Sequence, residues 1–151
     1  MAVQRTLVLV KPDGVQRGLI GDVVTRLERR GLKIVGMKLL NVSNDLARKH
    51  YAEHEGKGFF PGLIAFIMSG PVVAMAVEGK DAIAAVRQSM GATNPVQAAP
   101  GSIRADFGLD IGRNIVHGSA NEADAQREVG LWFADSELVS FTKDHQRWLT
   151  E

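Results

Sequence analysis

A compact run of apolar and β-branched residues at positions 6–10 restricts the fold more than any other feature of this sequence. A short run of this kind that ends at a turn signal is typical of a buried β-strand. The turn signal follows at once as Lys11-Pro12-Asp13-Gly14. The sequence therefore predicts a buried strand that ends at Lys11.

The next segment has the periodicity of an amphipathic helix. Ile20, Val23, Val24 and Leu27 recur at the spacing of one helical face, and Gly31 supplies a stop signal. Similar patterns of apolar residues and breakers predict the elements that follow. They place strands at residues 33–40 and 72–77, and helices at residues 46–53, 62–68 and 81–90.

The second half of the chain is less regular. Residues 91–113 are rich in turn residues and show no period, so they predict a long loop, and loops of this length are usually functional or disordered. Ile115 and Val116 predict a brief fourth strand. A helix capped by Ser119 or Asn121 is expected next, and the tail from Leu131 onward is expected to be mostly irregular.

This order of elements indicates an α/β (α+β) sandwich. It fits a ferredoxin-like βαββαβ core with a four-stranded antiparallel sheet, added helices and a long loop before the last strand. Two layers, with the helices on one face of the sheet, would satisfy the pattern. The chain has 151 residues and no internal repeat, so we expect a single domain over residues 1–151.

Composition excludes several classes of protein. Lys and Arg total 18 and Asp and Glu total 17, so no global field recruits nucleic acid or an anionic membrane. The sequence has no cysteine, which removes disulfides, thiolate zinc sites and thiol nucleophiles. No stretch resembles a signal peptide or a membrane span of about 20 apolar residues. A cytoplasmic protein is the expectation.

Two motifs offer alternative functions. His50-Tyr51-Ala52-Glu53-His54 matches H-x-x-E-H, the inverted zinc-peptidase motif, so a zinc hydrolase using His50 and His54 stays open as an alternative. A ferredoxin-like fold is also compatible with a non-catalytic nucleic-acid-binding module. That role needs aromatic residues on the central strands, and residues 6–10 and 72–77 contain none. Neither Gly56-Lys57 nor Gly79-Lys80 completes a phosphate-binding P-loop.

His117 is the strongest candidate for chemistry. It stands directly before Gly118-Ser119 and an acidic helix start. Histidine titrates near pH ~6.5, so a ring nitrogen is free to attack at neutral pH without a separate base. Four further residues favour phosphate, and together with His117 they resemble a known arrangement; they are Lys11, Arg87, Thr93 and Arg104.

Six segments are similar, in order and spacing, to the nucleoside diphosphate kinase family. They are Lys11-Pro12-Asp13-Gly14-Val15, Phe59-Phe60, Ser69-Gly70-Pro71-Val72-Val73, Gly91-Ala92-Thr93-Asn94-Pro95, Ser102-Ile103-Arg104 and Asn114-Ile115-Val116-His117-Gly118-Ser119. The resemblance implies ping-pong transfer of the γ-phosphate of a nucleoside triphosphate, typically ATP, to a nucleoside diphosphate. It makes His117 the nucleophile that becomes phosphohistidine.

The resemblance also implies roles for the other site residues. Lys11, Arg87, Thr93 and Arg104 serve the phosphates together with Mg²⁺, which the nucleotide's own phosphates largely hold, so no protein metal ligands are expected. The base stacks on Phe59 and packs against an apolar partner, and stacking accepts any base. The remaining assignments are Ile111 at the base, Lys11 and Asn114 at the ribose, Tyr51 near His117 and Lys11, and Glu128 and Ser119 orienting the imidazole.

The sequence departs from many relatives at two positions. Gly58 stands in place of a proline before the two phenylalanines, and Ala120 stands in place of an aspartate after the His-Gly-Ser centre. The first is expected to loosen the nucleotide-clamping segment, and the second to affect stability. Relatives form hexamers or tetramers, and the long tail favours a homohexamer. Neither a membrane nor nucleic acid is required as a partner.

Overall fold

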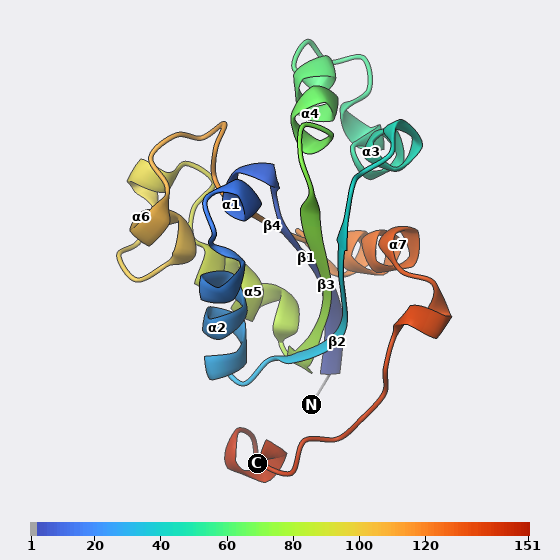
Figure 1. Cartoon of the computed structure of the whole chain (residues 1–151). Helices are drawn as coiled ribbons and strands as arrows, with labels where there is room; N and C mark the ends of the chain where they lie inside the picture. The colour runs from blue at the N-terminus through green and yellow to red at the C-terminus, as the bar shows by residue number, and fades with distance from the viewer. Residues whose placement is uncertain (1–2) are drawn as a thin grey trace.

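The computed structural model describes residues 3–151, and its centre is a four-stranded sheet (Figure 1). The strands are β1 (Val3–Val10), β2 (Lys33–Leu40), β3 (Val72–Lys80) and β4 (Val116–Gly118), in the spatial order β2-β3-β1-β4. Every neighbouring pair is antiparallel. The predicted ferredoxin-like sheet is therefore confirmed. Strand β4 begins one residue later than expected and extends to Gly118, so it contains His117.

Helices connect these strands, and their bounds differ in part from the expected ones. The first connection carries α1 at a position read from the sequence as a turn, followed by the expected amphipathic helix. The helices are α1 (Pro12–Gln16), α2 (Ile20–Arg29), α3 (Asn44–His50), α4 (Phe60–Ile67), α5 (Ala82–Met90), α6 (Ile103–Phe107) and α7 (Glu122–Trp132).

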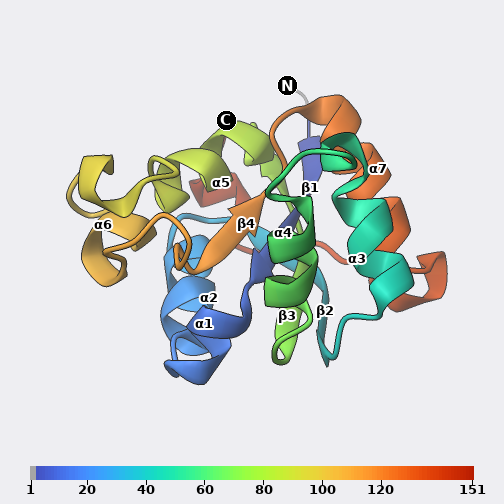
Figure 2. The ribbon, with the colours of Figure 1, turned by 90° about the horizontal axis from the view of Figure 1, so that it is seen from above.

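The expectation of two layers with helices on one face is wrong, because helices cover both faces of the sheet. Leu7 and Leu9 of β1 pack into one core with residues of α3, α4 and α7, whereas Val8 and Val10 pack into a second core with α2 and α5. Figures 1 and 2 show the two groups of helices on opposite sides of the strands. Strands buried on both faces read as continuous apolar runs, which explains why β1 lacks alternation.

The segment before β4 contains structure that its sequence did not predict. The 3₁₀ turn η2 (Pro95–Gln97) and helix α6 lie within residues 91–113. The side chains of Asn94 and Ser102 cap these elements by accepting hydrogen bonds from Val96 N–H and Ala105 N–H. Elements of three and five residues are too short to show a period. This folded segment positions Arg104 and supports the residues that enter β4.

The connection between β2 and β3 is a helical excursion in place of a hairpin. Helix α3, capped by Ser43, ends at His50, and the 3₁₀ turn η1 (Ala52–His54) then leads towards α4. The tail after α7 contains two 3₁₀ turns, η3 (Asp135–Glu137) and η4 (Gln146–Trp148), and is otherwise irregular, as expected. Within residues 3–151, no helix has both the length and the apolarity for a membrane span.

Candidate active site

His117 lies in the middle of β4, opposite Leu9 of β1. Its Nε2 atom is 2.8 Å from Oε1 of Glu128 on α7. Because an ionised carboxylate only accepts hydrogen bonds, the imidazole proton belongs on Nε2. The lone pair of Nδ1 is then free, and the ring keeps an exposed fraction of 24%. The geometry therefore leaves Nδ1 as the ring nitrogen that can act as a nucleophile.

Hydrogen bonds fix the position of the Glu128 carboxylate. Its Oε1 atom also accepts a 2.7 Å hydrogen bond from the Ser119 hydroxyl, and Ser119 Oγ lies 3.3 Å from the backbone N–H of Leu7. Burial opposes ionisation of Glu128, but the hydrogen bonds from His117 and Ser119 outweigh it and place the pKa of the carboxyl below its ordinary value. Glu128 thus contacts the imidazole directly, and Ser119 reaches it through Glu128; the expectation that both residues orient the imidazole stays a prediction.

His50 packs against the other side of His117, with ring centroids 4.8 Å apart and the rings nearly perpendicular. The indole N–H of Trp132 donates to His50 Nδ1 over 3.0 Å. Burial, followed by the neighbouring His117, lowers the pKa of His50 to about 3. His50 is therefore neutral at physiological pH and carries its proton on Nε2. The hydrogen bond between Trp132 and His50 was not predicted, because the two residues are far apart in the sequence and share no local pattern.

These contacts overturn the zinc-hydrolase alternative. Helix α3 ends at His50, so His54 lies in the turn η1 and the two histidines are not one helical turn apart on a continuous helix. The His54 ring contacts Glu53 and Lys57. Among the described residues, the one cluster with metal-ligand spacing is His50, His117 and Glu128, without His54. Trp132 already occupies one nitrogen of His50, and ligation through the other would require an imidazolate.

The nucleic-acid alternative also loses its structural basis. That function of a ferredoxin-like fold uses an open sheet face on which bases stack. Here both faces of the central strand β1 are buried under helices. The sheet serves as a core, in agreement with its lack of aromatic residues.

A strained turn leads into β4. Ile115 has a φ of 76°, a conformation that is rare for a β-branched residue, and Val116 N–H donates to Asn114 O over 2.8 Å to close a γ-turn. The backbone N–H of Lys11 donates to Ile115 O over 2.8 Å, and Ile115 N–H donates to Asp13 Oδ2 over 3.0 Å. This turn fixes the direction from which Asn114 and His117 enter the site.

Arg104, on α6, is buried beside this turn. Its guanidinium donates to three backbone carbonyls: Asn114 O at 3.1 Å, Gly91 O at 3.2 Å and Val116 O at 2.7 Å. Burial lowers the pKa of Arg104 to about 10, which leaves the group charged at neutral pH. A guanidinium has five N–H donors, so two N–H groups stay available for a ligand.

The other cationic candidates gather around the same turn. Lys11 Nζ donates to Asn114 Oδ1, and Asn114 Nδ2 donates to Thr93 O over 3.0 Å. Burial lowers the pKa of Lys11 to about 8, and the neighbouring Asp13 partly offsets this effect. Arg87 on α5 donates to Gly118 O over 3.1 Å. Lys11, Arg87, Thr93, Arg104 and Asn114 thus lie around β4, and their roles at the phosphates and ribose stay predictions.

The residues expected at the base are less closely joined to this cluster. The side chains of Phe59 and Ile111 are exposed, at 54% and 58%, and Phe59 contacts His54 and Lys57. Tyr51 packs edge-on against His50 at 4.7 Å, one ring removed from His117, and burial raises its pKa to about 12. Phe59 and Ile111 have the exposure that a stacking surface for a ligand requires.

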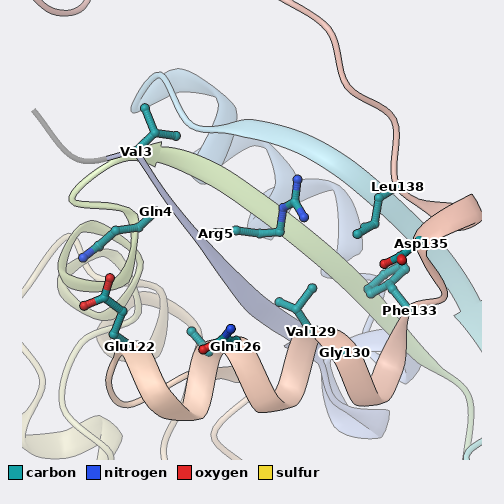
Figure 3. Close-up of a pocket in the computed structure, with 11 residues that line it drawn as sticks. Val3, Gln4, Arg5, Glu122, Gln126, Val129, Gly130, Phe133, Asp135 and Leu138 are labelled. Atoms are coloured by element: carbon teal, nitrogen blue, oxygen red, sulfur yellow. The ribbon is translucent and has the colours of Figure 1, made fainter.

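A well-formed hollow lies away from this chemistry. Figure 3 shows it between the start of β1, helix α7 and the segment that follows the helix. Its lining includes Arg5, which is paired with Glu78, but not His117. We place the candidate active site at His117, because there a nucleophile, its orienting carboxylate and three cationic side chains converge.

Comparisons with known proteins point to one family. The family model described as nucleoside diphosphate kinase matches residues 4–138. A nucleoside diphosphate kinase of Archaeoglobus fulgidus is 58% identical over 149 residues, covering 99% of this chain and 99% of that protein. One of Synechococcus is also 58% identical, covering 99% of this chain and all of that protein.

Solved structures of the same family share the fold. A halophilic nucleoside diphosphate kinase from Halobacterium salinarum, in complex with CDP, has a TM-score of 0.96 at 56% identity and covers 99% of this chain and 100% of that chain. A Borrelia burgdorferi enzyme, described as a transition state mimic with bound vanadate and ADP, has a TM-score of 0.91 at 44% identity and covers 98% of each chain.

Proposed function

This chain belongs to the nucleoside diphosphate kinase family, and from that premise we propose that His117 carries the phosphoryl group between its two nucleotide substrates. The protein is a phosphotransferase that moves the terminal phosphate of a nucleoside triphosphate to a nucleoside diphosphate. The observation that supports the residue assignment is the 2.8 Å contact between His117 Nε2 and Glu128, which leaves Nδ1 free to attack.

The proposed reaction has two halves. Nδ1 of His117 attacks the γ-phosphorus, a P–N bond forms, and the bond from phosphorus to the bridging oxygen breaks to release the nucleoside diphosphate. The phosphorylated ring then gains positive charge, which the Glu128 carboxylate stabilises through the Nε2–H hydrogen bond. In the second half, the terminal phosphate oxygen of a new nucleoside diphosphate attacks the same phosphorus and His117 leaves.

The cationic side chains supply most of the remaining catalysis. Phosphoryl transfer passes through a loose transition state whose charge spreads over the phosphate oxygens, so positioning and cations matter more than covalent chemistry. We assign this task to Arg104, Arg87 and Lys11, with Thr93 at the phosphates and Asn114 and Lys11 at the ribose. Arg104 supports the assignment with two N–H groups that its three carbonyl contacts leave free.

The site suits a polyphosphate that brings its own cation. Of the carboxylates near the strained turn, Glu128 Oε1 is hydrogen-bonded to His117 and Ser119, whereas Asp13 accepts from Ile115 N–H through Oδ2 and has a buried Oδ1 with no hydrogen-bond partner. One free carboxylate oxygen is too few for the octahedral shell of Mg²⁺. We therefore propose that Mg²⁺ is held mainly by nucleotide phosphates, where it neutralises charge on the transferred group. Addition of EDTA is expected to prevent phosphorylation of the enzyme by ATP, and excess Mg²⁺ is expected to restore it, as intact mass measures. Undiminished phosphorylation in EDTA would contradict the assignment.

Broad base specificity follows from stacking. Phe59 and Ile111 offer exposed apolar surface without polar groups that read base edges, and Tyr51 lies deeper, behind His50. Purine and pyrimidine bases alike have a face that stacks on an aromatic ring. We propose that the enzyme accepts both classes, in ribose and deoxyribose forms.

The phosphoenzyme is the direct test of the proposed function. The purified protein is mixed with Mg·ATP and no acceptor, and intact mass is recorded before and after addition of a nucleoside diphosphate. One acid-labile phosphoryl group that maps to His117 and leaves with the acceptor supports the mechanism. A folded protein that forms no phosphoenzyme, or that carries the group on another residue, would refute it.

Activity is expected to fall as pH rises above about 8, where Lys11 loses its proton. The ratio kcat/KM reports the free enzyme, so its pH profile should show this limb. Stability should move in the opposite direction. Because the pKa in the folded state lies below 10.5, the unfolded chain binds more protons between about pH 8 and 10.5, and this group makes stability rise with pH there.

Thermal unfolding recorded beside activity separates titration from denaturation. Lys11→Arg is the matched variant, because a guanidinium stays charged at the pH where Lys11 loses its proton, and the variant should shift the falling limb to higher pH. If the falling limb of the kcat/KM profile is unchanged in this variant, the limb reports the titration of a group other than Lys11.

Two further features of the protein stay proposals. We infer a homohexamer, with a tetramer as the other possible assembly, and exposed Met37 and Leu39 on the edge strand β2 give a surface that a partner subunit would cover. Light scattering of the native protein distinguishes the two assemblies. Cytoplasmic localisation and a single domain over residues 1–151 stay predictions from the sequence.

A further inference from the structure

We propose that Asp13 is a positioning residue that holds Ile115 in its left-handed conformation and thereby sets the placement of Asn114 and His117. The inference rests on the proposed function of His117 and deepens it. Asp13 is absent from the residues to which the sequence assigned a role. It lies on α1, far from β4 in sequence, and reaches the active site through a backbone contact.

Ile115 has a strained backbone conformation. Its φ of 76° is in the region that favours glycine, and a β-branched side chain opposes it through clashes with the neighbouring backbone. Such a conformation persists only where surrounding contacts over-determine it. The side chain of Ile115 is fully buried, so the core fixes one end of the residue but leaves its peptide groups to be held by other contacts.

Hydrogen bonds from other parts of the chain hold the peptide groups around Ile115. Lys11 N–H holds the carbonyl of Ile115, and Arg104 holds the carbonyls of Asn114 and Val116 on either side. All of these groups are donors to carbonyl oxygens. The N–H of Ile115 is the polar group that remains, and its acceptor is Asp13 Oδ2 at 3.0 Å. Without this acceptor, the strained residue would have a buried donor unpaired.

Helix α1 approaches this turn closely. A Cβ atom added at Gly14 would lie 2.7 Å from Val10 Cγ1, 3.0 Å from Ile115 Cγ2 and 3.1 Å from Ile115 O, so a larger residue would force α1 away from this turn. This packing places Asp13 directly under the Ile115 N–H. Asp13 also faces the cations Lys11 and Arg104, whose pKa values its negative charge raises. A hydrogen-bonding role and a counter-charge role are therefore both physically available to Asp13.

The experiment compares Asp13→Asn with Asp13→Ala in the full-length enzyme. The asparagine keeps an acceptor oxygen for Ile115 N–H but has no charge, whereas the alanine has neither. We expect Asp13→Ala to lower kcat by about tenfold to a hundredfold, the range that misplacement of reacting groups produces, with KM for nucleotide changed much less. Asp13→Asn is expected to stay within a few-fold of the wild type. Equal losses in both variants would overturn the proposal in favour of a counter-charge.

A double substitution tests the strain itself. Glycine adopts a positive φ without penalty, so in an Ile115→Gly background the loss of Asp13 should have little further effect on kcat. A full additive loss in the double variant would overturn the proposal. Unfolding curves give the folded fraction to which each rate is normalised. If Asp13→Ala does not fold, the test rests on Asp13→Asn alone. A decrease in its kcat of more than about tenfold would then contradict the positioning role of Asp13.

The failure of this inference is distinguishable from failure of the proposed function. Wild-type phosphorylation by Mg·ATP, mapped to a residue, tests His117 and does not involve Asp13. If the phosphoryl group maps to His117 and single-turnover phosphorylation of Asp13→Ala is as fast as in the wild type, only the role of Asp13 is wrong.

Discussion

Replacing His117 with alanine is expected to abolish phosphoryl transfer while leaving the protein folded. No other described side chain combines a free nucleophilic nitrogen with the orienting carboxylate of Glu128, so kcat should fall by at least about 10³-fold, a modest figure for loss of a covalent nucleophile. The stability change should be small. The ring is partly exposed, and Glu128 keeps its hydrogen bond from Ser119 when the imidazole is removed.

A coupled assay with two different nucleotides measures the loss, and thermal unfolding verifies the fold. His145→Ala is the matched control, because His145 lies exposed in the tail next to η4, away from the site. It should retain native activity. Transfer at the native rate by folded His117→Ala protein would sink the assignment of the nucleophile.

Arg104→Ala should have the second largest effect, on activity and stability together. Loss of one preorganised charge at the transferred phosphate typically lowers kcat by about 10²-fold or more. The substitution also removes the buried donor of three backbone carbonyls; Asn114 O keeps its hydrogen bond from Val116 N–H, and each carbonyl left unpaired costs about 1–3 kcal/mol. Because two of these carbonyls, those of Asn114 and Val116, flank the strained turn, we expect the variant to melt at a clearly lower temperature.

Arg104→Lys separates the two effects. Lysine retains the positive charge, but its ammonium group lacks the planar fork that contacts three carbonyls and a phosphate at once. It should recover part of the activity and little of the stability, as kcat and thermal unfolding measure under the same conditions. An Arg104→Ala protein with native kcat would remove Arg104 from the phosphate site.

The sequence predicted those elements whose signals are local. The strand at residues 6–10 and the helix that begins at Ile20 are defined by apolar runs and spacing, and both occur in the structure. Helix α6 was missed because five residues are too few to show a period, and its formation depends on the Ser102 cap and on packing. The presence of helices on both faces of the sheet was not predicted, for a different reason. A continuous apolar strand is buried, but its sequence does not say how many faces are covered.

The site divides in the same way. The residues named by resemblance occupy short motifs similar to those of the family, and the structure gathers most of them around β4. Asp13, His50 and Trp132 act through contacts that no local pattern encodes: a side chain on a backbone N–H, an edge-on ring and an indole N–H on a buried imidazole. Such contacts exist only after the chain has folded, so a single sequence cannot reveal them.

The topology of the sheet also has a consequence for biosynthesis. The hydrogen bond between Lys11 and Asn114 spans 103 residues, and the one between Leu7 and Ser119 spans 112. Strand β4 therefore docks beside β1 only after nearly the whole chain has left the ribosome, and contacts of such long sequence separation close slowly. Regain of activity should be among the last events of refolding, and an N-terminal fragment released early should have no partial activity.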